Sequence, residues 1–388
     1  MTGAAAFLDR VAAFAAGPVR AGAPGWSMGE SPAPDLFTEA ARIGLLSMSI
    51  PPEHGGAGFG FATLARACEL LAAEDFGLAM ALVNTHNVAL RLCRSAPPDL
   101  VARHLPGLLS GEVAACTALT EPGAGSGFAA IAARAEPEDG AWCLSGEKTW
   151  IINARRAGLA IVFAHCGTPA GARSIGGFAV DLGLPGVTHH PVDSAFAQGA
   201  MGTGRLVFER TPLPSGALIL PPGSAFKSIM TELNAARTYV AAMCNAMTGA
   251  ALAEAATYGS ERHSFGRPLA AHQAWRMPLT EAETDLAASR ALTTQAVAEV
   301  GAGGDAQLSA ARAKIAATDC AVRHLPRLLH AMGAEGLRPE RCFTRHLAAA
   351  QIASLTDGAT TMLRERVARL TLPCTDQTTA KTTDQTRE

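Results

Sequence analysis

The spacing of apolar residues predicts a helical region in the first part of the chain. From Leu36 to about Ala102, apolar side chains recur every three or four positions, as in Phe37, Ala40 and Ala41, which is the period of a helix with one buried face. Residues 49–60 interrupt this spacing with two prolines and four glycines, a composition that breaks helices. We therefore expect several helices with a loop inside the region.

The period changes after Gly111. The following residues form short runs rich in Val, Ile, Phe and Trp that are separated by Gly, Pro and Asp, a pattern typical of strands. The clearest runs are residues 142–144, 160–164, 177–180 and 205–208. They predict an antiparallel β region of about a hundred residues.

Helical spacing returns at Ala225 and continues to about Leu370, with interruptions at residues 266–268, 301–304 and 333–339. Three or four long helices with short connections are typical of a bundle. A polar, Thr-rich segment follows, which we expect to be disordered. The predicted fold class is therefore multidomain α+β, with an N-terminal helical domain (1–112), a central antiparallel β-barrel-like domain (113–220), a C-terminal four-helix bundle (221–372) and a tail (373–388).

Composition narrows the class of protein. The 388 residues are 48% hydrophobic and 17% charged, which excludes a disordered chain. A formal net charge of -2 gives no long-range attraction to nucleic acid or to an acidic membrane, so we expect neither as a partner. Nine cysteines without a CxxC pair argue against a metal site or a disulfide framework and favour a reducing compartment.

The N-terminus lacks the pattern of a secretory signal, because Asp9, Arg10 and Pro18 interrupt its apolar residues. The sequence also has no stretch of the roughly 20 uninterrupted apolar residues that would span a bilayer. We therefore expect a cytoplasmic protein without membrane insertion.

A glycine-rich segment, residues 119–127, precedes the first predicted strands. Its sequence LTEPGAGSG predicts a loop whose backbone N–H groups can approach a phosphate or an aromatic ring edge. It is not a Rossmann fingerprint, because strands follow it, and it is not a P-loop, because GK[ST] is absent. Taken alone, an ordinary glycine-rich turn explains it equally well. Trp150 and Asn153, slightly further on, are by themselves best explained as a core tryptophan and a turn.

Three more motifs lie in the helical C-terminal region. Arg262, within residues 261–269, stands at a predicted helix end, where a guanidinium could bind a diphosphate; the alternative is a helix–helix turn with solvated arginines. Residues 332–337 alone indicate only the end of a helix. Asp357 is a lone carboxylate at a helix break in residues 355–359, and alone it is best explained as a capping residue.

Together, in this order and spacing, the five motifs resemble the acyl-CoA dehydrogenase family. The resemblance covers about residues 37–370 and is strongest at 118–153 and 262–273. It implies a three-domain fold with FAD in a cleft between the β domain and the C-terminal helices. It also implies a homotetramer or dimer in which a neighbouring subunit completes the adenosine end of the cofactor site.

The same resemblance assigns site residues by position. The catalytic base is Asp357, in place of the family's usual glutamate. The positions that bind FAD are occupied by Leu119, Thr120, Gly125, Ser126, Trp150, Ile152, Arg262, Phe265, Gln273, His330, Gly333, Gly336 and Ala359. The positions that border the substrate are occupied by Ser126, Asn234, Ala236, Arg237, Tyr239, Thr356 and Gly358.

The chemistry implied is the α,β-desaturation of an acyl thioester. A carboxylate removes the α-proton while a hydride leaves the β-carbon for flavin N5. Hydrogen-bond donors must hold the thioester carbonyl, and the resemblance implies that one of them is the backbone N–H of Asp357. Burial of the carboxylate in an apolar cleft would raise its pKa toward a useful value.

Departures from the family pattern concentrate at the base. Asp357 is one methylene shorter than glutamate, which is about 1.5 Å. The resemblance also implies a second position at which some family members carry a glutamate base, just before Arg237. Ala236 occupies it here and cannot act as a base. Ile152 replaces a threonine that donates to flavin N5. Further replacements relative to the family are Gly127, His330, Ala334 and Ala359.

These departures suggest a specialised relative. The favoured hypothesis is a dehydrogenase of a biosynthetic pathway that acts on an acyl-CoA or acyl-carrier-protein thioester. Its electron acceptor would be an electron-transfer flavoprotein or dioxygen. The alternatives are a nitroalkane-oxidase-like enzyme, or another flavin oxidase or monooxygenase on the same fold, and a catalytically inactive FAD-binding scaffold.

Overall fold

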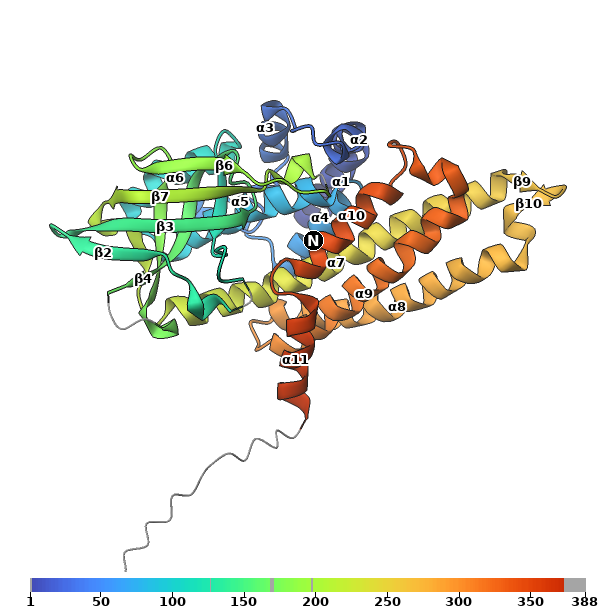
Figure 1. Cartoon of the computed structure of the whole chain (residues 1–388). Coiled ribbons are helices and arrows are strands. Elements are labelled where there is room, and N and C mark those ends of the chain that lie inside the picture. Colours follow the sequence, from blue (N-terminus) through green and yellow to red (C-terminus); the bar gives the residue numbers. More distant parts are fainter. Residues whose placement is uncertain (1, 126, 168–170, 197, 373–388) are drawn as a thin grey trace, which may run out of the picture.

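The structure is a computed structural model that describes residues 2–125, 127–167, 171–196 and 198–372. Its N-terminal part is helical, as predicted (Figure 1). The helices there are α1 (Thr2–Phe14), a π-helical turn (Ala15–Val19), α2 (Arg20–Ser27), α3 (Pro34–Arg42), α4 (Phe61–Ala72), α5 (Phe76–Ser95) and α6 (Pro98–Ser110). The predicted loop at residues 49–60 contains a short 3-10 turn, Pro52–His54.

Helix α5 connects the N-terminal helices to the β region. It begins at Phe76 because Oδ1 of Asp75 accepts a 2.7 Å hydrogen bond from the N–H of Leu78, one of the donors that a helix start leaves unpaired. The helix is buried along most of its length. It packs against α4, α6 and β1, so its side chains can reach both halves of the molecule.

The central region is a sheet. Its strands are β1 (Ala114–Ala118), β2 (Arg134–Glu138), β3 (Ala141–Ile151), β4 (Ala157–Cys166), β5 (Ile175–Asp181), β6 (Val187–Pro191), β7 (Gly204–Leu213) and β8 (Leu218–Leu220). Their order is β6-β7-β3-β2-β4-β5-β8, and β1 pairs with β4. All four runs that the sequence marked as strands lie within β3, β4, β5 and β7.

Not every strand pair is antiparallel, which corrects the prediction in one respect. Strand β4 pairs in parallel with β1, where Thr117 stands opposite Ile161, and with β2, where Arg134 stands opposite His165. Side chains alternate with a period of two in both kinds of strand. The direction of pairing depends on the connections between strands, so the hydrophobic pattern could not distinguish the two.

The C-terminal region is helical again. Its elements are α7 (Ala225–Glu261), the hairpin β9 (His263–Ser264) and β10 (Arg267–Pro268), α8 (Gln273–Gly301), α9 (Gln307–Met332), α10 (Phe343–Leu355) and α11 (Thr360–Thr371). Three of the breaks between these helices coincide with the interruptions in the sequence pattern, and a fourth separates α10 from α11. Helix α7 is about 55 Å long at 1.5 Å per residue. The predicted tail (373–388) lies outside the described residues.

Helix α7 links the sheet to the bundle. Its first turns belong to a buried cluster with the β region, in which Phe128 stacks on Phe226 with ring centroids 5.4 Å apart. Its middle belongs to a second buried cluster with α4, α5 and α9, to which Tyr239 and Val240 contribute. Figure 1 shows α7 running from beneath the sheet into the bundle. Side chains at the middle of α7 therefore lie where the three parts meet.

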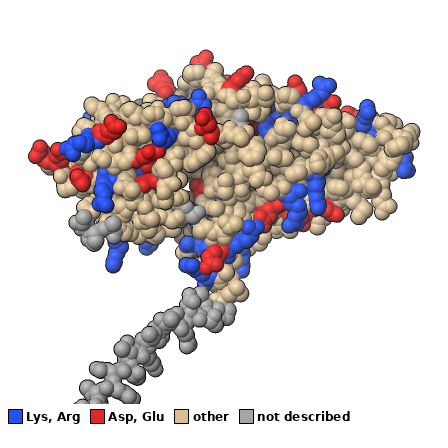
Figure 2. All heavy atoms as spheres, in the orientation of Figure 1, with Lys and Arg blue, Asp and Glu red and all other residues tan. Residues whose placement is uncertain are grey.

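Charge is distributed without a dominant sign on the face drawn in Figure 2, where basic and acidic residues stand among many uncharged ones. None of the helices in the described ranges is both long and apolar enough to cross a bilayer. The cysteines within those ranges are all free. The same ranges contain no group of three or more His, Cys, Asp or Glu side chains placed to hold a metal ion.

Candidate active site

Asp357 lies on the turn between α10 and α11. Asp357 and Gly358 both have positive φ, 55° and 100°, so two successive residues are in the left-handed region. Aspartate tolerates this region better than most side chains, but strained backbone of this kind still costs on the order of 1–3 kcal/mol. Asp357 is not the cap of α11, because the residue at that position is Ala359. Other contacts must therefore fix the turn.

Two basic side chains hold the turn by its carbonyl groups. Nζ of Lys314, on α9, donates hydrogen bonds to the carbonyl oxygens of Thr356 and Gly358, the latter at 2.6 Å. Nε of Arg237, on α7, donates to the carbonyl oxygen of Asp357 at 3.0 Å. Three successive carbonyl groups are thus bound by cations, and hydrogen bonds from charged donors are stronger than neutral ones.

The carboxyl group of Asp357 is left without a partner. The residue is half-buried overall, but its Oδ2 atom is shielded from solvent and accepts no hydrogen bond from the described residues. Burial raises the pKa of this carboxyl, while the positive charges of Lys314 and Arg237 oppose the rise. Unpaired buried oxygens are uncommon in folded proteins, so this atom makes Asp357 a candidate functional residue.

Of the α7 residues predicted to border the substrate, Arg237 contacts Asp357 directly. Asn234, Ala236, Arg237 and Tyr239 are all buried. Burial, and to a smaller extent the charge of Asp357, raise the pKa of Tyr239. The hydroxyl of Tyr239 accepts a 3.3 Å hydrogen bond from Nδ2 of Asn87 on α5. The sequence motifs did not include Asn87.

Asn234 and Thr356, also predicted to border the substrate, have hydrogen-bond partners within the protein as well. Oδ1 of Asn234 accepts a 2.9 Å hydrogen bond from Nη1 of Arg237, so the amide helps to orient the guanidinium. The hydroxyl of Thr356 donates to the carbonyl of Ile352 at 2.9 Å. Both residues therefore support the turn directly or through a neighbour.

The glycine-rich segment is anchored by a buried ion pair. Glu121 accepts hydrogen bonds from the N–H groups of Ala132 and Ala133, at 2.5 and 3.0 Å, and from Nζ of Lys148 at 2.7 Å. Lys148 also donates to the carbonyl of Leu119 at 3.1 Å. The Lys148 and Glu121 side chains are only 0% and 5% exposed. One end of the segment is therefore fixed to the sheet.

Two glycines of this segment and Trp150, near the end of β3, face open space. A Cβ atom added at Gly123 or Gly125 would meet no atom within 4 Å. The N–H of Thr149 donates to the carbonyl of Thr120 at 3.0 Å, which holds β3 beside the segment. The next residue, Trp150, has a φ of 58° and is 55% exposed, so it is not a core tryptophan. An open backbone beside an exposed aromatic ring fits the flat ring system of a flavin.

Ile152, Ala359 and Ser126 are the other residues that the family resemblance assigns to the flavin end of the cofactor. Ile152 is half-buried and packs against the helical core cluster. Ala359 lies at the start of α11, two residues from Asp357. Ser126 lies outside the described residues.

A second group of predicted FAD residues lies at the far end of the bundle. Arg262, Phe265, Gln273, His330 and Gly333 are exposed there, and Gly336 is buried. The indole N–H of Trp275 donates to the carbonyl of Ala331 at 2.9 Å, which ties the start of α8 to the end of α9. Along α7, residue 262 lies about 37 Å from residue 237. Within one copy, this second group is therefore remote from Asp357.

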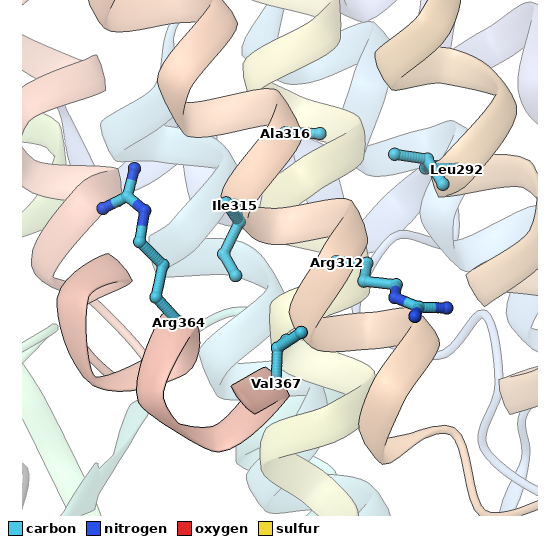
Figure 3. Close-up of a pocket in the computed structure, with 6 residues that line it drawn as sticks. All are labelled: Leu292, Arg312, Ile315, Ala316, Arg364 and Val367. Atoms are coloured by element: carbon cyan, nitrogen blue, oxygen red, sulfur yellow. The ribbon is translucent and has the colours of Figure 1, made fainter. Parts of the chain in front are cut away.

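A hollow lined by α8, α9 and α11 is separate from the candidate site. A groove of about 350 Å³ runs between α8, α9 and α11, and Figure 3 shows Ile315 and Val367 pointing toward each other between Arg312 and Arg364. On a helix that turns about 100° per residue, Arg312 faces away from Lys314. The groove and Asp357 thus lie on different sides of α9.

Comparison with known proteins gives the class of the fold and then its family. Sequence profiles of the acyl-CoA dehydrogenase N-terminal, middle and C-terminal domains match residues 3–112, 116–211 and 223–372. The chain is 30% identical over 329 residues to the mitochondrial short-chain specific acyl-CoA dehydrogenase of Bos taurus, covering 84% of this chain and 80% of that protein. It is 29% identical over 334 residues to the cyclohex-1-ene-1-carbonyl-CoA dehydrogenase of Geobacter metallireducens, covering 85% and 87%.

A solved structure agrees with the sequence matches. The butyryl-CoA dehydrogenase of Megasphaera elsdenii superposes with a TM-score of 0.89 at 26% identity, covering 95% of this chain and 97% of that one. The fold and the site therefore define a flavin-dependent oxidoreductase that acts on CH–CH groups. The chain belongs to the acyl-CoA dehydrogenase family.

Sequence motifs missed several residues that support the site. Lys314 and Lys148 are two of only four lysines in the chain, and both are wholly buried. In a chain whose basic residues are otherwise arginines, a lysine within an apolar helical run, such as residues 310–317, is the signal that could have identified Lys314. For Asn87 no comparable signal exists in the sequence.

Proposed function

We propose that the protein is a FAD-dependent acyl-thioester dehydrogenase in which Asp357 removes the α-proton of the substrate. The observation that carries this proposal is the buried, unpartnered Oδ2 of Asp357, whose pKa is raised. A general base needs an oxygen free of hydrogen bonds and a pKa brought toward the working pH. Arg237 and Lys314 bind carbonyl groups and so leave the carboxylate to the substrate.

The turn also offers an N–H group. In the part of the chain that the structure describes, the backbone N–H of Asp357 has no acceptor, whereas that of Thr356 donates to Ile352 at 3.0 Å. A donor at residue 357 would hold the thioester carbonyl and stabilise the charge that develops on its oxygen as the α-proton leaves. When bound, FAD supplies the hydride acceptor for the β-carbon.

Residues of two copies would hold the cofactor. In this proposal, Leu119, Thr120, Gly125, Ser126, Trp150, Ile152 and Ala359 of one copy surround the flavin. The second group, Arg262, Phe265, Gln273, His330, Gly333 and Gly336, reaches the diphosphate and adenosine bound to a neighbouring copy. Phe265 is 95% exposed, and an apolar ring that one chain leaves uncovered supports burial against another. The assembly is thus proposed as a homodimer or homotetramer.

The proposed substrate is a compact acyl group on coenzyme A or an acyl carrier protein, in a specialised biosynthetic pathway of the cytoplasm. Relatives named for short-chain acyl-CoA and cyclohex-1-ene-1-carbonyl-CoA support a small acyl group. The Asn87–Tyr239 hydrogen bond adds polar atoms near the base. Electrons would pass from the flavin to an electron-transfer flavoprotein or to dioxygen.

Anaerobic mixing of the FAD-loaded protein with a panel of acyl-CoA and acyl-carrier-protein thioesters tests the proposal. At least one thioester should bleach the flavin absorbance within seconds to minutes. A protein that keeps its FAD yet is not reduced by any thioester in a panel spanning short, branched and cyclic acyl groups would contradict the proposed function.

A nitroalkane-oxidase-like activity is the second candidate, and the aspartate base is the observation that favours it. A carbon acid such as a primary nitroalkane also needs a carboxylate to remove its proton, and Ile152 gives flavin N5 no hydroxyl. In air, primary nitroalkanes should then yield aldehyde, nitrite and peroxide. If nitrite is absent while thioesters bleach the flavin, the dehydrogenase proposal is favoured.

Replacement of Gly358 with alanine tests the importance of the turn. The added Cβ would lie 2.7 Å from Cε of Met362 and 3.3 Å from Nη2 of Arg237, at a φ of +100°. We expect flavin reduction to slow on the order of a hundredfold, because displacements of about 1 Å have effects of that size. Gly301→Ala is the matched control, since its Cβ would meet no atom within 4 Å. Equal rates for the two variants would show that the turn geometry is unimportant.

A further inference from the structure

Lys314 is a fully buried lysine in the core of the bundle. It lies on α9 among alanines, with an exposed fraction of 0%. A buried ammonium group is costly unless it is paired or hydrogen-bonded. Its partners are the carbonyl oxygens of Thr356 and Gly358, which are neutral and leave its charge uncompensated by direct contact.

The carboxylate whose charge acts on Lys314 is that of Asp357, the residue between those two carbonyl groups. Asp357 and Lys314 influence each other's ionisation in opposite senses, yet the hydrogen bonds of the Lys314 ammonium go to the carbonyl groups on either side of Asp357. The other titratable or charged groups that act on Lys314 are Cys244 and Arg237 of α7, and Arg237 in turn is influenced by Arg366 of α11. The positive charge of Lys314 therefore stabilises the carboxylate of Asp357 without a hydrogen bond to either carboxylate oxygen.

We propose that Lys314 is a positioning residue for the base: it clamps the two carbonyl groups that flank Asp357 and keeps the buried carboxyl ionised without binding it. The inference deepens the proposed function and rests on it for its catalytic meaning. A direct salt bridge would hold the carboxylate oxygens that the substrate needs. Binding through the backbone separates the two tasks, because the turn is held at its carbonyls while the carboxylate stays free.

Asp357 and Lys314 should determine the acidic and the alkaline limb, respectively, of the pH dependence of flavin reduction. Because burial raises the pKa of Asp357, the fraction of active carboxylate grows as pH rises through that value. Burial lowers the pKa of Lys314 to about 8, so above about pH 8 the ammonium loses its charge and its charge-assisted bonds to the turn. The rate of flavin reduction should therefore rise and then fall with pH.

The test compares Lys314→Met and Lys314→Arg with the wild-type FAD-loaded protein. The apparent pKa of the Asp357 carboxyl is followed by infrared titration, with Asp357→Asn to identify its band. Removing the charge should raise that pKa by about one pH unit and slow flavin reduction at neutral pH at least tenfold. Arginine stays charged to much higher pH, so Lys314→Arg should keep the carboxyl pKa and move the alkaline limb of the rate profile upward.

Two control variants separate charge from packing. Thr318→Val removes the 3.2 Å contact between the hydroxyls of Thr318 and Thr360 and loosens the same junction without changing charge. Arg312→Met removes a cation from an exposed position on the same helix. Neither should move the pKa of the Asp357 carboxyl. An equal shift in Thr318→Val, or no shift in Lys314→Met, would overturn the proposal.

The outcomes remain distinct if a variant or the proposed reaction fails. If Lys314→Met does not yield folded protein, Lys314→Arg decides alone, and an alkaline limb that stays near the wild-type value overturns the proposal. The infrared titration needs no substrate. Failure of every thioester to reduce the wild-type flavin would remove the proposed function, while the carboxyl titration would still decide whether Lys314 sets the ionisation of Asp357.

Discussion

Asp357→Asn should lower the rate of flavin reduction by thioester on the order of 10²–10⁴-fold, the range that a general base contributes. The amide has nearly the same shape as the carboxyl but cannot accept the α-proton. The buried Oδ2 position is retained, so substrate and FAD should still bind. Rapid-mixing absorbance at the flavin band, without oxygen, gives the rate for both proteins.

Asp319→Asn is the matched control for this change. Asp319 lies on α9 of the same bundle, but its carboxylate is paired with Arg364 at 2.7 Å and is partly exposed. That variant should reduce its flavin at the wild-type rate. Undiminished reduction in Asp357→Asn, with FAD bound, would show that another group removes the proton.

Lys148→Met should cause the largest loss of stability among single changes near the site. It leaves Glu121 as a buried charge without its cation, and breaking a buried pair in this way costs about 3–5 kcal/mol in the free energy of unfolding. The glycine-rich segment would lose its anchor as well, because Lys148 also binds the carbonyl of Leu119. We therefore expect a lower urea midpoint together with weaker retention of FAD.

Two further variants serve as controls for the stability loss expected in Lys148→Met. Lys227→Met removes an exposed lysine and should leave the urea midpoint almost unchanged, as surface substitutions usually do. The double variant Lys148→Met, Glu121→Gln should recover part of the loss, because it removes the unpaired charge. A midpoint for Lys148→Met within experimental scatter of the wild type would show that the ion pair does not anchor the segment.

The sequence predicted the elements of the fold well because their hydrophobic periods are long and clear. The helical spacing before Gly111 and after Ala225, and the four strand runs between them, all appear in the structure. Glycine and proline clusters at 49–60 and 266–268 marked real breaks. The parallel pairing of β4 with β1 and β2 was missed, because pairing direction depends on connections that a local pattern does not contain.

The sequence predicted only those site residues that belong to a recognisable motif. Family resemblance pointed to Asp357, and the structure shows that its Oδ2 is buried and unpartnered. The two sets of FAD positions were indicated together, but their separation along α7 becomes visible only once the helix is known to be continuous from Ala225 to Glu261. Trp150 was interpreted alone as a core residue and is exposed, since exposure depends on what packs against a strand end.

Supporting residues could not be inferred from motifs because their partners are distant in the sequence. Lys314 binds the backbone carbonyls of residues 356 and 358. Every residue has such a carbonyl whatever its side chain, so no sequence pattern indicates this contact. The Asn87–Tyr239 hydrogen bond joins α5 to α7. Contacts of this kind depend on tertiary packing, which sets the details of the site after local preferences have set the elements.

The measurement that tests the proposed reaction most directly is single-turnover flavin reduction by a thioester carrying deuterium at the α-carbon or at the β-carbon. If Asp357 removes the α-proton and FAD takes the β-hydride, each deuterium should slow the reduction, and one 2-enoyl thioester should form for each flavin reduced. Flavin reduction that is insensitive to both deuterium positions, or that yields no enoyl product, would contradict the proposed function.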